Sequence, residues 1–317
     1  MSPSTALEQL ASFRAQNLRA SQEFLDKASP LLKDFKNTKV DDDVWPVIEQ
    51  LAMASLDVGR LDIAKTAWKA LADRIGQDSP RVILLQGLIM EATEPLDLVL
   101  RFYESEAQKN AHNPIFWKRQ VAVLRQMGKT EDAVNELRQL LDTFYNDLEA
   151  WLELADLYSS CCHYSSTLQA LSHALLLAPQ NPFTFLQFAE TVFTAGDIPL
   201  ALKNFLIVID MNDSDVSAPQ DQSPTGITVR AWWGVKLVRP SPFAYAGCIF
   251  LTNLACQCAR RLLYPPGGTA SESASKTPIP KNLKLIDQLA TERVLTAYSG
   301  ERGIHNRDVV SRWMSRD

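Results

Sequence analysis

The residues best suited to metal or nucleophilic chemistry stand together at Cys161, Cys162 and His163, with His173 ten residues further on. Thiolate and imidazole groups bind zinc well, and structural zinc sites take four of them, usually as two spaced pairs. Adjacent residues point to different sides of a helix, and the chain holds no second pair with zinc spacing. We therefore expect no metal here and interpret the two cysteines as small buried thiols in a turn.

Other patterns that carry chemistry are missing from the sequence. It contains no G-x-x-x-x-G-K phosphate loop, no H-E-x-x-H, no G-x-S-x-G and no C-x-x-C. Cys256 and Cys258 are two residues apart and so do not share a helix face. His112 and His305 fall in predicted loops, where we expect solvated rather than catalytic side chains. The sequence thus predicts no cofactor, no metal and no catalytic residue.

What the chain does contain is a repeat. Trp117, Trp151 and Phe185 stand 34 residues apart, and two further triplets have the same spacing: Ala133, Thr167 and Ala201, and Leu137, Leu171 and Phe205. This period is typical of tetratricopeptide helix-turn-helix arrays. We interpret the recurring aromatic residues as packing between helices rather than as a platform on which bases stack.

The pattern within one repeat is helical. In the clearest unit, apolar residues fall at i, i+3, i+4 and i+7 on a first helix and recur on a second. Each hairpin has an apolar face that only a neighbouring hairpin covers, so we predict an all-α tetratricopeptide solenoid with a divergent helical C-terminal extension. The predicted packing residues are Trp117, Ala133, Leu137, Trp151, Leu154, Ala155, Tyr158, Leu171, Phe185, Ala201 and Phe205.

Start and turn signals support this phasing independently. Five hairpins are expected to begin near residues 45, 80, 114, 148 and 182. Ser79, Asn113 and Asn181 each precede a proline, which is the arrangement of an N-cap followed by proline at the first helical position. Glycines at 59, 128 and 196 mark turns inside hairpins. The second hairpin is the least regular, because Glu106 stands where an apolar residue belongs.

Composition shifts divide the chain into five segments. Residues 1–44 form a helical lead-in, 45–215 the five repeats, 216–264 a divergent hairpin, 265–280 a linker and 281–317 a last helix with a polar tail. The divergent hairpin is expected to pair a helix at 225–238 with a long one at 243–264. The linker is rich in Ser, Pro and Gly and is predicted to be disordered. Apolar positions of the lead-in are Leu7, Leu10, Phe13, Leu18, Phe24 and Leu25.

Charge and composition exclude several classes of protein. The net charge is −5 and no concentrated basic block occurs, which argues against nucleic-acid binding. Five cysteines, an odd number, favour a reducing compartment. The longest apolar stretch is shorter than the roughly 20 residues of a spanning helix, and the N-terminus does not resemble a secretory signal. We expect a protein of the cytosol or of the cytosolic side of a membrane.

The resemblance to tetratricopeptide proteins implies a partner-binding groove lined by the first helix of each hairpin. Phe183, Leu186 and Phe193 are large apolar residues on that face, and an exposed apolar patch favours binding. The alternative is that these are ordinary solvated or half-buried helix residues. The resemblance also implies no clamp for a terminal carboxylate, because Lys118 is the only clamp residue that matches. Groove candidates are Lys118, Arg125, Leu152, Asp156, Ser159, Phe183, Leu186, Glu190 and Phe193.

Trp232 and Trp233 give a further candidate. Neighbouring residues lie about 100° apart around a helix, so one ring is expected to pack inward and the other, Trp233, to face a partner.

A more specific resemblance extends over about residues 40–238. The run from Trp117-Lys118-Arg119 through Glu149-Ala150-Trp151, with Leu154, Ala155 and Tyr158, resembles subunit 2 of the endoplasmic reticulum membrane protein complex. The resemblance implies a non-catalytic scaffold on the cytosolic face of that membrane. Implied partners are cytosolic parts of membrane-embedded subunits, including the YidC-like insertase subunit, and a peripheral cytosolic subunit. The assembled complex inserts tail-anchored and multipass membrane proteins.

Two other functions stay open from the sequence. One is a tetratricopeptide adaptor in another multi-subunit assembly. The second is an enzyme with a helical regulatory domain, which the lack of any segment with an alternating strand and helix pattern disfavours.

Overall fold

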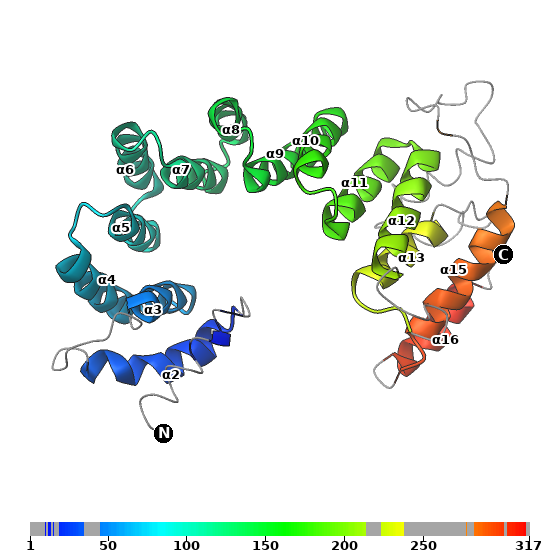
Figure 1. The fold of residues 1–317 in the computed structure, drawn as a ribbon, viewed down its shortest axis with the longest axis horizontal. Coiled ribbons are helices and arrows are strands. Elements are labelled where there is room, and N and C mark those ends of the chain that lie inside the picture. The colour runs from blue at the N-terminus through cyan, green and yellow to red at the C-terminus, as the bar shows by residue number, and fades with distance from the viewer. Residues whose placement is uncertain are drawn as a thin grey trace. The chain divides into compact units, whose positions relative to one another are not determined.

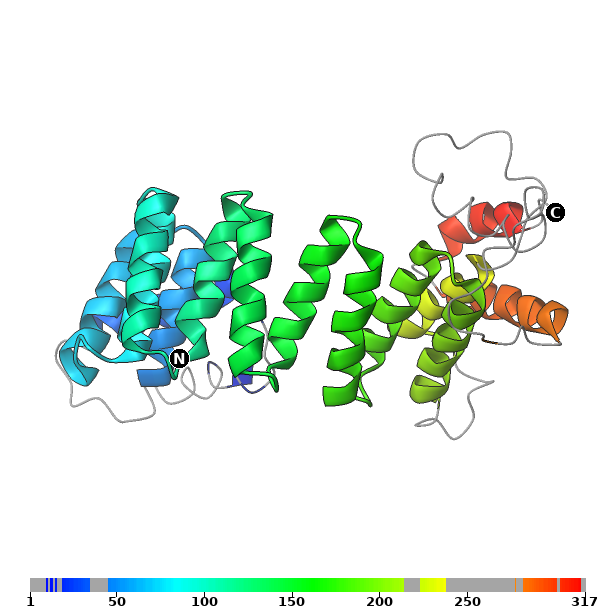
Figure 2. The same cartoon turned by 90° about the horizontal axis from the view of Figure 1, so that it is seen from above.

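The computed structural model describes residues 10, 12–13, 15, 19–34, 45–213, 223–237, 277, 282–300 and 303–314. Every element defined within these ranges is an α-helix (Figure 1). The chain divides into two compact units, Met1–Leu140 and Leu141–Asp317. Each unit is a stack of antiparallel helix pairs joined by short turns, which Figure 2 shows from above.

The first unit begins each of its hairpins where the 34-residue phasing starts one, at Trp45, Pro80 and Pro114. α2 precedes the hairpins and packs on α3, through a cluster that includes the lead-in residues Leu10, Phe13, Phe24 and Leu25. The helices are α2 (Ser21–Asp34), α3 (Trp45–Asp57), α4 (Leu61–Ile75), α5 (Pro80–Thr93), α6 (Leu96–Lys109), α7 (Pro114–Gln126) and α8 (Thr130–Thr143), whose last turn belongs to the second unit.

The second unit continues the same pattern and then departs from it. α9 (Leu148–Ser160) pairs with α10 (Tyr164–Leu177), and α11 (Pro182–Ala195) pairs with α12 (Ile198–Asp213). α13 (Ile227–Leu237) packs on α12, and α15 (Leu283–Ala297) packs on α13 and contacts α16 (Ile304–Met314).

α16 lies in the segment for which the sequence indicated only a polar tail, and it includes His305, which was wrongly expected in a loop. Val310 and Met314 are four residues apart, on one helical face, and both are buried in the core of the second unit. Their spacing was the available signal for this helix.

Local signals explain where the helices begin. The side-chain oxygens of Asn113 and Asn181 accept hydrogen bonds from the backbone N–H groups of Ile115 and Phe183, at 3.1 and 3.0 Å. These bonds satisfy donors that the first turn of a helix leaves unpaired. Ser79 has the extended backbone of an N-cap but makes no side-chain bond, so the start of α5 rests on Pro80.

The turns inside four of the five hairpins use a left-handed residue, the exception being the turn between α5 and α6. Gly59, Gly128 and Gly196 have φ values of 80°, 74° and 94°. Cys162 stands 34 residues after Gly128 and 34 before Gly196, and it has a φ of 59° without being glycine. The fourth hairpin therefore makes the same turn as its neighbours with a side chain in a disfavoured conformation.

Most of the predicted packing positions are fully buried, namely Ala133, Leu137, Leu154, Ala155, Leu171, Ala201 and Phe205. The larger aromatic residues Trp117, Trp151, Tyr158 and Phe185 are half-buried. The Trp117 indole N–H donates to the Glu136 carboxylate at 2.9 Å, and that of Trp151 donates to the Tyr145 carbonyl at 2.9 Å. Both rings thus bridge elements through a polar edge as well as an apolar face.

Glu106, the irregular position of the second hairpin, is buried with 7% of its surface exposed. Lys109 lies one turn further along α6 and donates to its carboxylate at 2.7 Å. This ion pair lets the carboxylate replace an apolar residue without remaining a buried unpaired charge.

Several predictions fall outside the described residues. They concern Leu7, Leu18, the helix at 243–264 and, apart from Thr277, the linker at 265–280. The five-segment division of the chain stays a prediction.

Candidate partner-binding surfaces

The predicted apolar groove on α11 is not open. Leu186 is only 4% exposed and belongs to a buried cluster that α11, α12 and α13 share with the C-terminal helices. Phe193 is half-buried against the same cluster. The expected exposure of Leu186 was wrong, because the divergent helix α13 contacts α11 as well as α12. Phe193 is only partly accessible, and its role toward a partner stays a prediction. Phe183, at the first turn of α11, remains 68% exposed.

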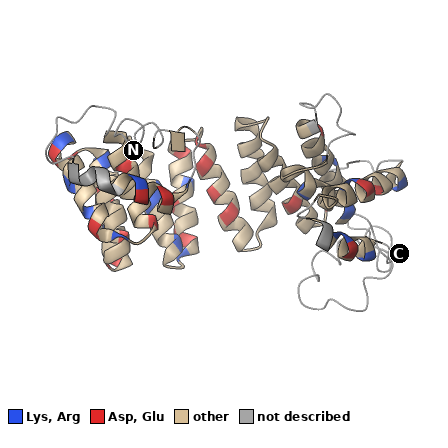
Figure 3. Ribbon diagram, turned by 90° about the horizontal axis from the view of Figure 1, so that it is seen from below, with Lys and Arg blue, Asp and Glu red and all other residues tan. Residues whose placement is uncertain are grey.

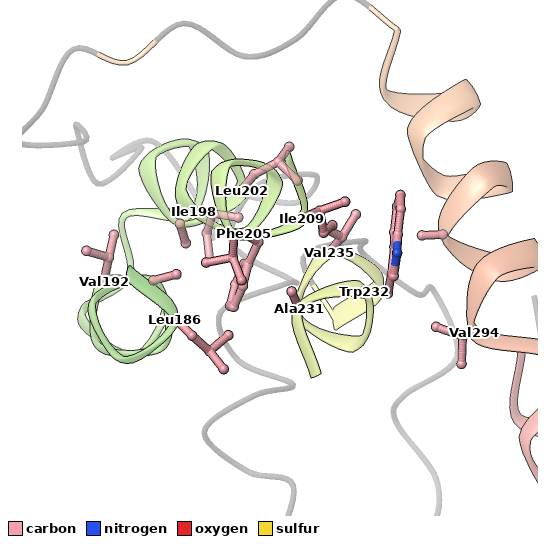
Figure 4. Close-up of a cluster of buried hydrophobic side chains, with 14 of the residues drawn as sticks. Leu186, Val192, Ile198, Leu202, Phe205, Ile209, Ala231, Trp232, Val235 and Val294 are labelled. Carbon is pink, nitrogen blue, oxygen red and sulfur yellow. The ribbon is translucent and has the colours of Figure 1, made fainter. Parts of the chain in front are cut away.

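The close approach of α13 to α12 depends on small residues. Gly234 is buried, and a Cβ atom placed there would lie 2.4 Å from the Phe205 ring. Figure 4 shows Phe205 on α12 directed toward α13, next to Ala231, with the Trp232 ring standing between α13 and α15 near Val294. Ala231 and Gly234 therefore provide the space in which the two helices pack.

Glu190, another groove candidate, already has a partner within the chain. Arg230 donates two hydrogen bonds to the Glu190 carboxylate, from Nε at 2.6 Å and from Nη2 at 2.8 Å. This paired geometry ties α13 to α11. Glu190 therefore makes a contact within the chain while its side chain stays 36% exposed, and its role toward a partner stays a prediction.

Trp233 is not the open surface residue that was expected, because it is half-buried. Its ring packs at 5.4 Å from the Trp313 ring of α16 and at 6.3 Å, edge to face, from that of Tyr298. The sequence argument correctly placed Trp232 inward, with 5% of its surface exposed, but it lacked the helix that covers Trp233.

Lys236 on α13 is a buried charged residue that the sequence analysis did not identify. Lys236 is 6% exposed, and its ammonium group donates to Asp287 at 2.8 Å and to the Thr291 hydroxyl at 2.7 Å, both on α15. A lysine in the last turn of a predicted helix suggests only a favourable interaction with the helix dipole. Its partner lies 51 residues away in sequence, so no local signal indicates the pair.

The remaining groove candidates lie on two helices. On α7, Lys118 is half-buried and Arg125 exposed; on α9, Leu152 and Ser159 are half-buried and Asp156 is exposed. α7 belongs to the first unit and α9 to the second, so these residues are two separate sets. Whether either set binds a partner stays a prediction.

The first unit has a buried polar network instead of an open site. The Tyr103 hydroxyl donates to Glu91 at 2.6 Å, and Arg119 pairs with the same carboxylate, with its Nε at 3.0 Å. Burial, and then the hydrogen bond to Glu91, raise the pKa of Tyr103. A phenol with a raised pKa stays protonated, so Tyr103 serves as a donor that links α6 to α5, and Arg119 adds α7.

A cavity of about 220 Å³ opens in the first unit between α3, α4 and α5. Its lining is mostly apolar, from Trp45, Leu71, Val82 and Leu85, with the Glu49 and Arg81 ion pair at one side. Sites for small molecules typically enclose about 300 to 1,000 Å³. This cavity is a gap between hairpins rather than a substrate site.

The vicinal cysteines are exposed, not buried as expected. Cys161 and Cys162 carry free thiols at the turn between α9 and α10, and His163 beside them is also exposed. This turn lies between the end of α9 at Ser160 and the start of α10 at Tyr164. Among the residues that the structure describes, no group of three or more His, Cys, Asp or Glu side chains is placed to hold a metal ion.

One set of exposed residues was missed. Leu176 is 79% exposed and Leu177 39%, both in the last turn of α10, a few residues before the exposed Phe183. The signal was available in the sequence, because no Asp, Glu, Lys or Arg occurs between Asp156 and Glu190.

Stacked antiparallel hairpins with a 34-residue period, left-handed turns and caps at the same phase define a tetratricopeptide repeat protein. A solved structure of similar fold supports this class: the C-terminal part of a TPR repeat-containing protein from Cytophaga hutchinsonii, with a TM-score of 0.53 and 11% identity, over 92% of this chain and 97% of that one.

Sequence comparison is more specific. Residues 80–199 match the model of the EMC2 TPR-like repeat domain. ER membrane protein complex subunit 2-B of Xenopus laevis is 33% identical over 214 residues, which cover 67% of this chain and 71% of the relative. TPR repeat protein oca3 of Schizosaccharomyces pombe is 37% identical over 155 residues, or 49% of this chain and 55% of the relative. The chain belongs to the family of ER membrane protein complex subunit 2.

Proposed function

We propose that this chain is a non-catalytic scaffold subunit on the cytosolic face of the endoplasmic reticulum membrane, within a complex that inserts tail-anchored and multipass membrane proteins. The observation that supports it most is the 33% identity with subunit 2-B over 214 residues. No helix among the described residues is long and apolar enough to cross a membrane.

The geometry supports a role in binding rather than in chemistry. Charged groups inside each unit form ion pairs, as Glu91 does with Arg119 and Lys236 with Asp287, and these pairs join α5 to α7 and α13 to α15. Such contacts fix the curvature of a stack, which determines the surface that it presents. The partners proposed are cytosolic parts of membrane-embedded subunits, including the insertase subunit, and a peripheral cytosolic subunit.

The test is affinity purification of the tagged full-length chain in mild detergent. Endoplasmic reticulum membrane subunits should be recovered in fixed proportion to the chain, and depleting the chain should lower insertion of a tail-anchored reporter. A generic adaptor of another assembly would recover different proteins. Recovery without any membrane subunit would overturn the proposal.

A further inference from the structure

The second unit exposes three large apolar side chains along one edge. In a stack of antiparallel hairpins, the second helix of one hairpin ends on the same edge where the first helix of the next begins. Leu176 and Leu177 close α10, and Phe183 opens α11 on that edge, with 79%, 39% and 68% of their surfaces exposed. We name these three residues the α10–α11 edge.

Repeat packing does not require apolar residues at these places. The residues 34 positions before and after Leu176 are Asp142 and Asp210, and the residue 34 before Phe183 is Glu149, all exposed. These are water-facing positions at which neighbouring hairpins carry carboxylates. Apolar side chains at these positions interact poorly with water and do not pack inside the unit. Such an exposed apolar patch is typical of a surface that a partner covers.

The charged residues near the α10–α11 edge are almost all acidic. Residues 141–213 contain nine Asp and Glu but a single Lys, and none of these charges falls between 157 and 189. Figure 3 shows α10 without any charged residue. Asp142, Glu149 and Asp210 stand at helix ends on the same edge as the apolar residues. An apolar centre bordered by carboxylates is complementary to a ligand with an apolar face bordered by Lys and Arg.

We propose that the α10–α11 edge docks a basic amphipathic helix of another polypeptide, whose apolar face covers Leu176, Leu177 and Phe183 while its Lys and Arg side chains meet the surrounding carboxylates. The identity of that polypeptide rests on the proposed function. Cytosolic segments that flank membrane spans carry an excess of Lys and Arg. The partner is accordingly a juxtamembrane segment of a membrane-embedded subunit. An anionic lipid surface does not fit, because the carboxylates would be repelled by it.

The first test measures binding of a synthetic helix to the full-length chain. The probe is a fluorescent peptide of about 18 residues with Leu along one face and Lys along the other. Leu176→Ser combined with Phe183→Ser should weaken its binding at least about tenfold, because apolar anchors supply most of such an interface. Asp142→Asn with Asp210→Asn should weaken it less and reduce its dependence on salt. Far-UV circular dichroism should be unchanged, since both apolar residues are exposed.

Two controls make the result decisive. Ile115 holds the place of Phe183 two hairpins earlier and is 43% exposed, so Ile115→Ser should leave the affinity unchanged. A peptide with Glu in place of Lys should bind at least about tenfold more weakly. Equal affinity of wild type and the double variant, or equal affinity for both peptides, would overturn the proposal. Binding of the chain to anionic or zwitterionic vesicles through Leu176 and Phe183 would also overturn it.

The second test uses the assembled complex. A photo-crosslinking amino acid at position 176 should form adducts with a segment rich in Lys and Arg next to a membrane span, whereas the same group at position 115 should not. Adducts only with lipid, or with an acidic segment, would contradict the proposal. If the chain recovers no membrane subunit, the proposed function fails, and the peptide measurement still decides what the edge binds.

Discussion

Cys162 adopts, in the fourth hairpin, the left-handed turn conformation that glycine has in the hairpins before and after it. Its φ is 59°, and a side chain in this region costs roughly 1 to 2 kcal/mol relative to the right-handed region. We predict that Cys162→Gly raises the free energy of unfolding by up to about 1 kcal/mol, because the relief of strain exceeds the added entropy of glycine in the unfolded chain. Urea unfolding followed by circular dichroism measures this.

The neighbouring residue is the control. Cys161 has a φ of −90°, so Cys161→Gly gains no relief and should destabilise the chain slightly. If Cys162→Gly is no more stable than Cys161→Gly, the turn does not have this backbone.

Gly87 is required by its neighbour rather than by its backbone. A Cβ atom at this position would lie 2.4 Å from the Tyr103 hydroxyl oxygen, which is held by Glu91. Gly87→Ala should therefore lower the free energy of unfolding by about 1 to 3 kcal/mol, the usual cost of overpacking a core. Gly300→Ala, with nothing within 4 Å of the added atom, should have little effect in the same melting experiment. Similar melting temperatures for the two variants would contradict the close contact.

The packing of α12 on α11 can be tested at Ala201. This residue has no exposed surface where α12 packs on α11, whereas Ala195 at the end of α11 is exposed. Ala201→Leu should cost about 1 to 3 kcal/mol of stability, and Ala195→Leu should cost much less. Equal melting temperatures of the two variants would show that the assigned packing of these helices is wrong.

The two ion pairs of α13 should differ in their contribution to stability. Arg230 and Glu190 are largely solvated, with side chains 68% and 36% exposed, so Arg230→Ala should cost less than about 1 kcal/mol. Lys236 and Asp287 are 5% and 16% exposed, and Lys236→Ala removes the buried ammonium group that contacts the Asp287 carboxylate and the Thr291 hydroxyl, at a cost of about 3 kcal/mol or more. Chemical denaturation of both variants compares them. A larger loss for Arg230→Ala would mean that α15 does not cover Lys236.

The two compact units should be visible in unfolding of the whole molecule. In stacked repeats each hairpin contacts its neighbours, and stability need not be shared along the whole chain. We expect different urea midpoints for probes in Met1–Leu140, such as Trp45 and Trp68, and in Leu141–Asp317, such as Trp232 and Trp313. Tryptophan-to-phenylalanine variants that leave probes in one unit at a time measure this. Coincident transitions would show a single cooperative unit.

Much of this architecture was predictable because the same features recur in successive repeats. Trp117, Trp151 and Phe185 recur at a fixed spacing, and Asn113 and Asn181 cap the helices that this spacing places. Capping, glycine turns and apolar periodicity act over a few residues, and each is therefore readable in sequence. The candidate binding residues were less predictable, since the position of a residue on a first helix does not tell whether a later element covers it.

The sequence by itself determined the helical class, the starts of the hairpins, the family and the charge-free run that ends at Glu190, because these depend on local periodicity and composition. Only the tertiary structure decided which faces remain open. Leu186 is buried by α12 and α13, Trp233 is covered by α16, and Lys236 pairs with Asp287 from α15. Exposure is set by contacts between segments far apart in the chain, and such contacts leave no periodic trace in either segment.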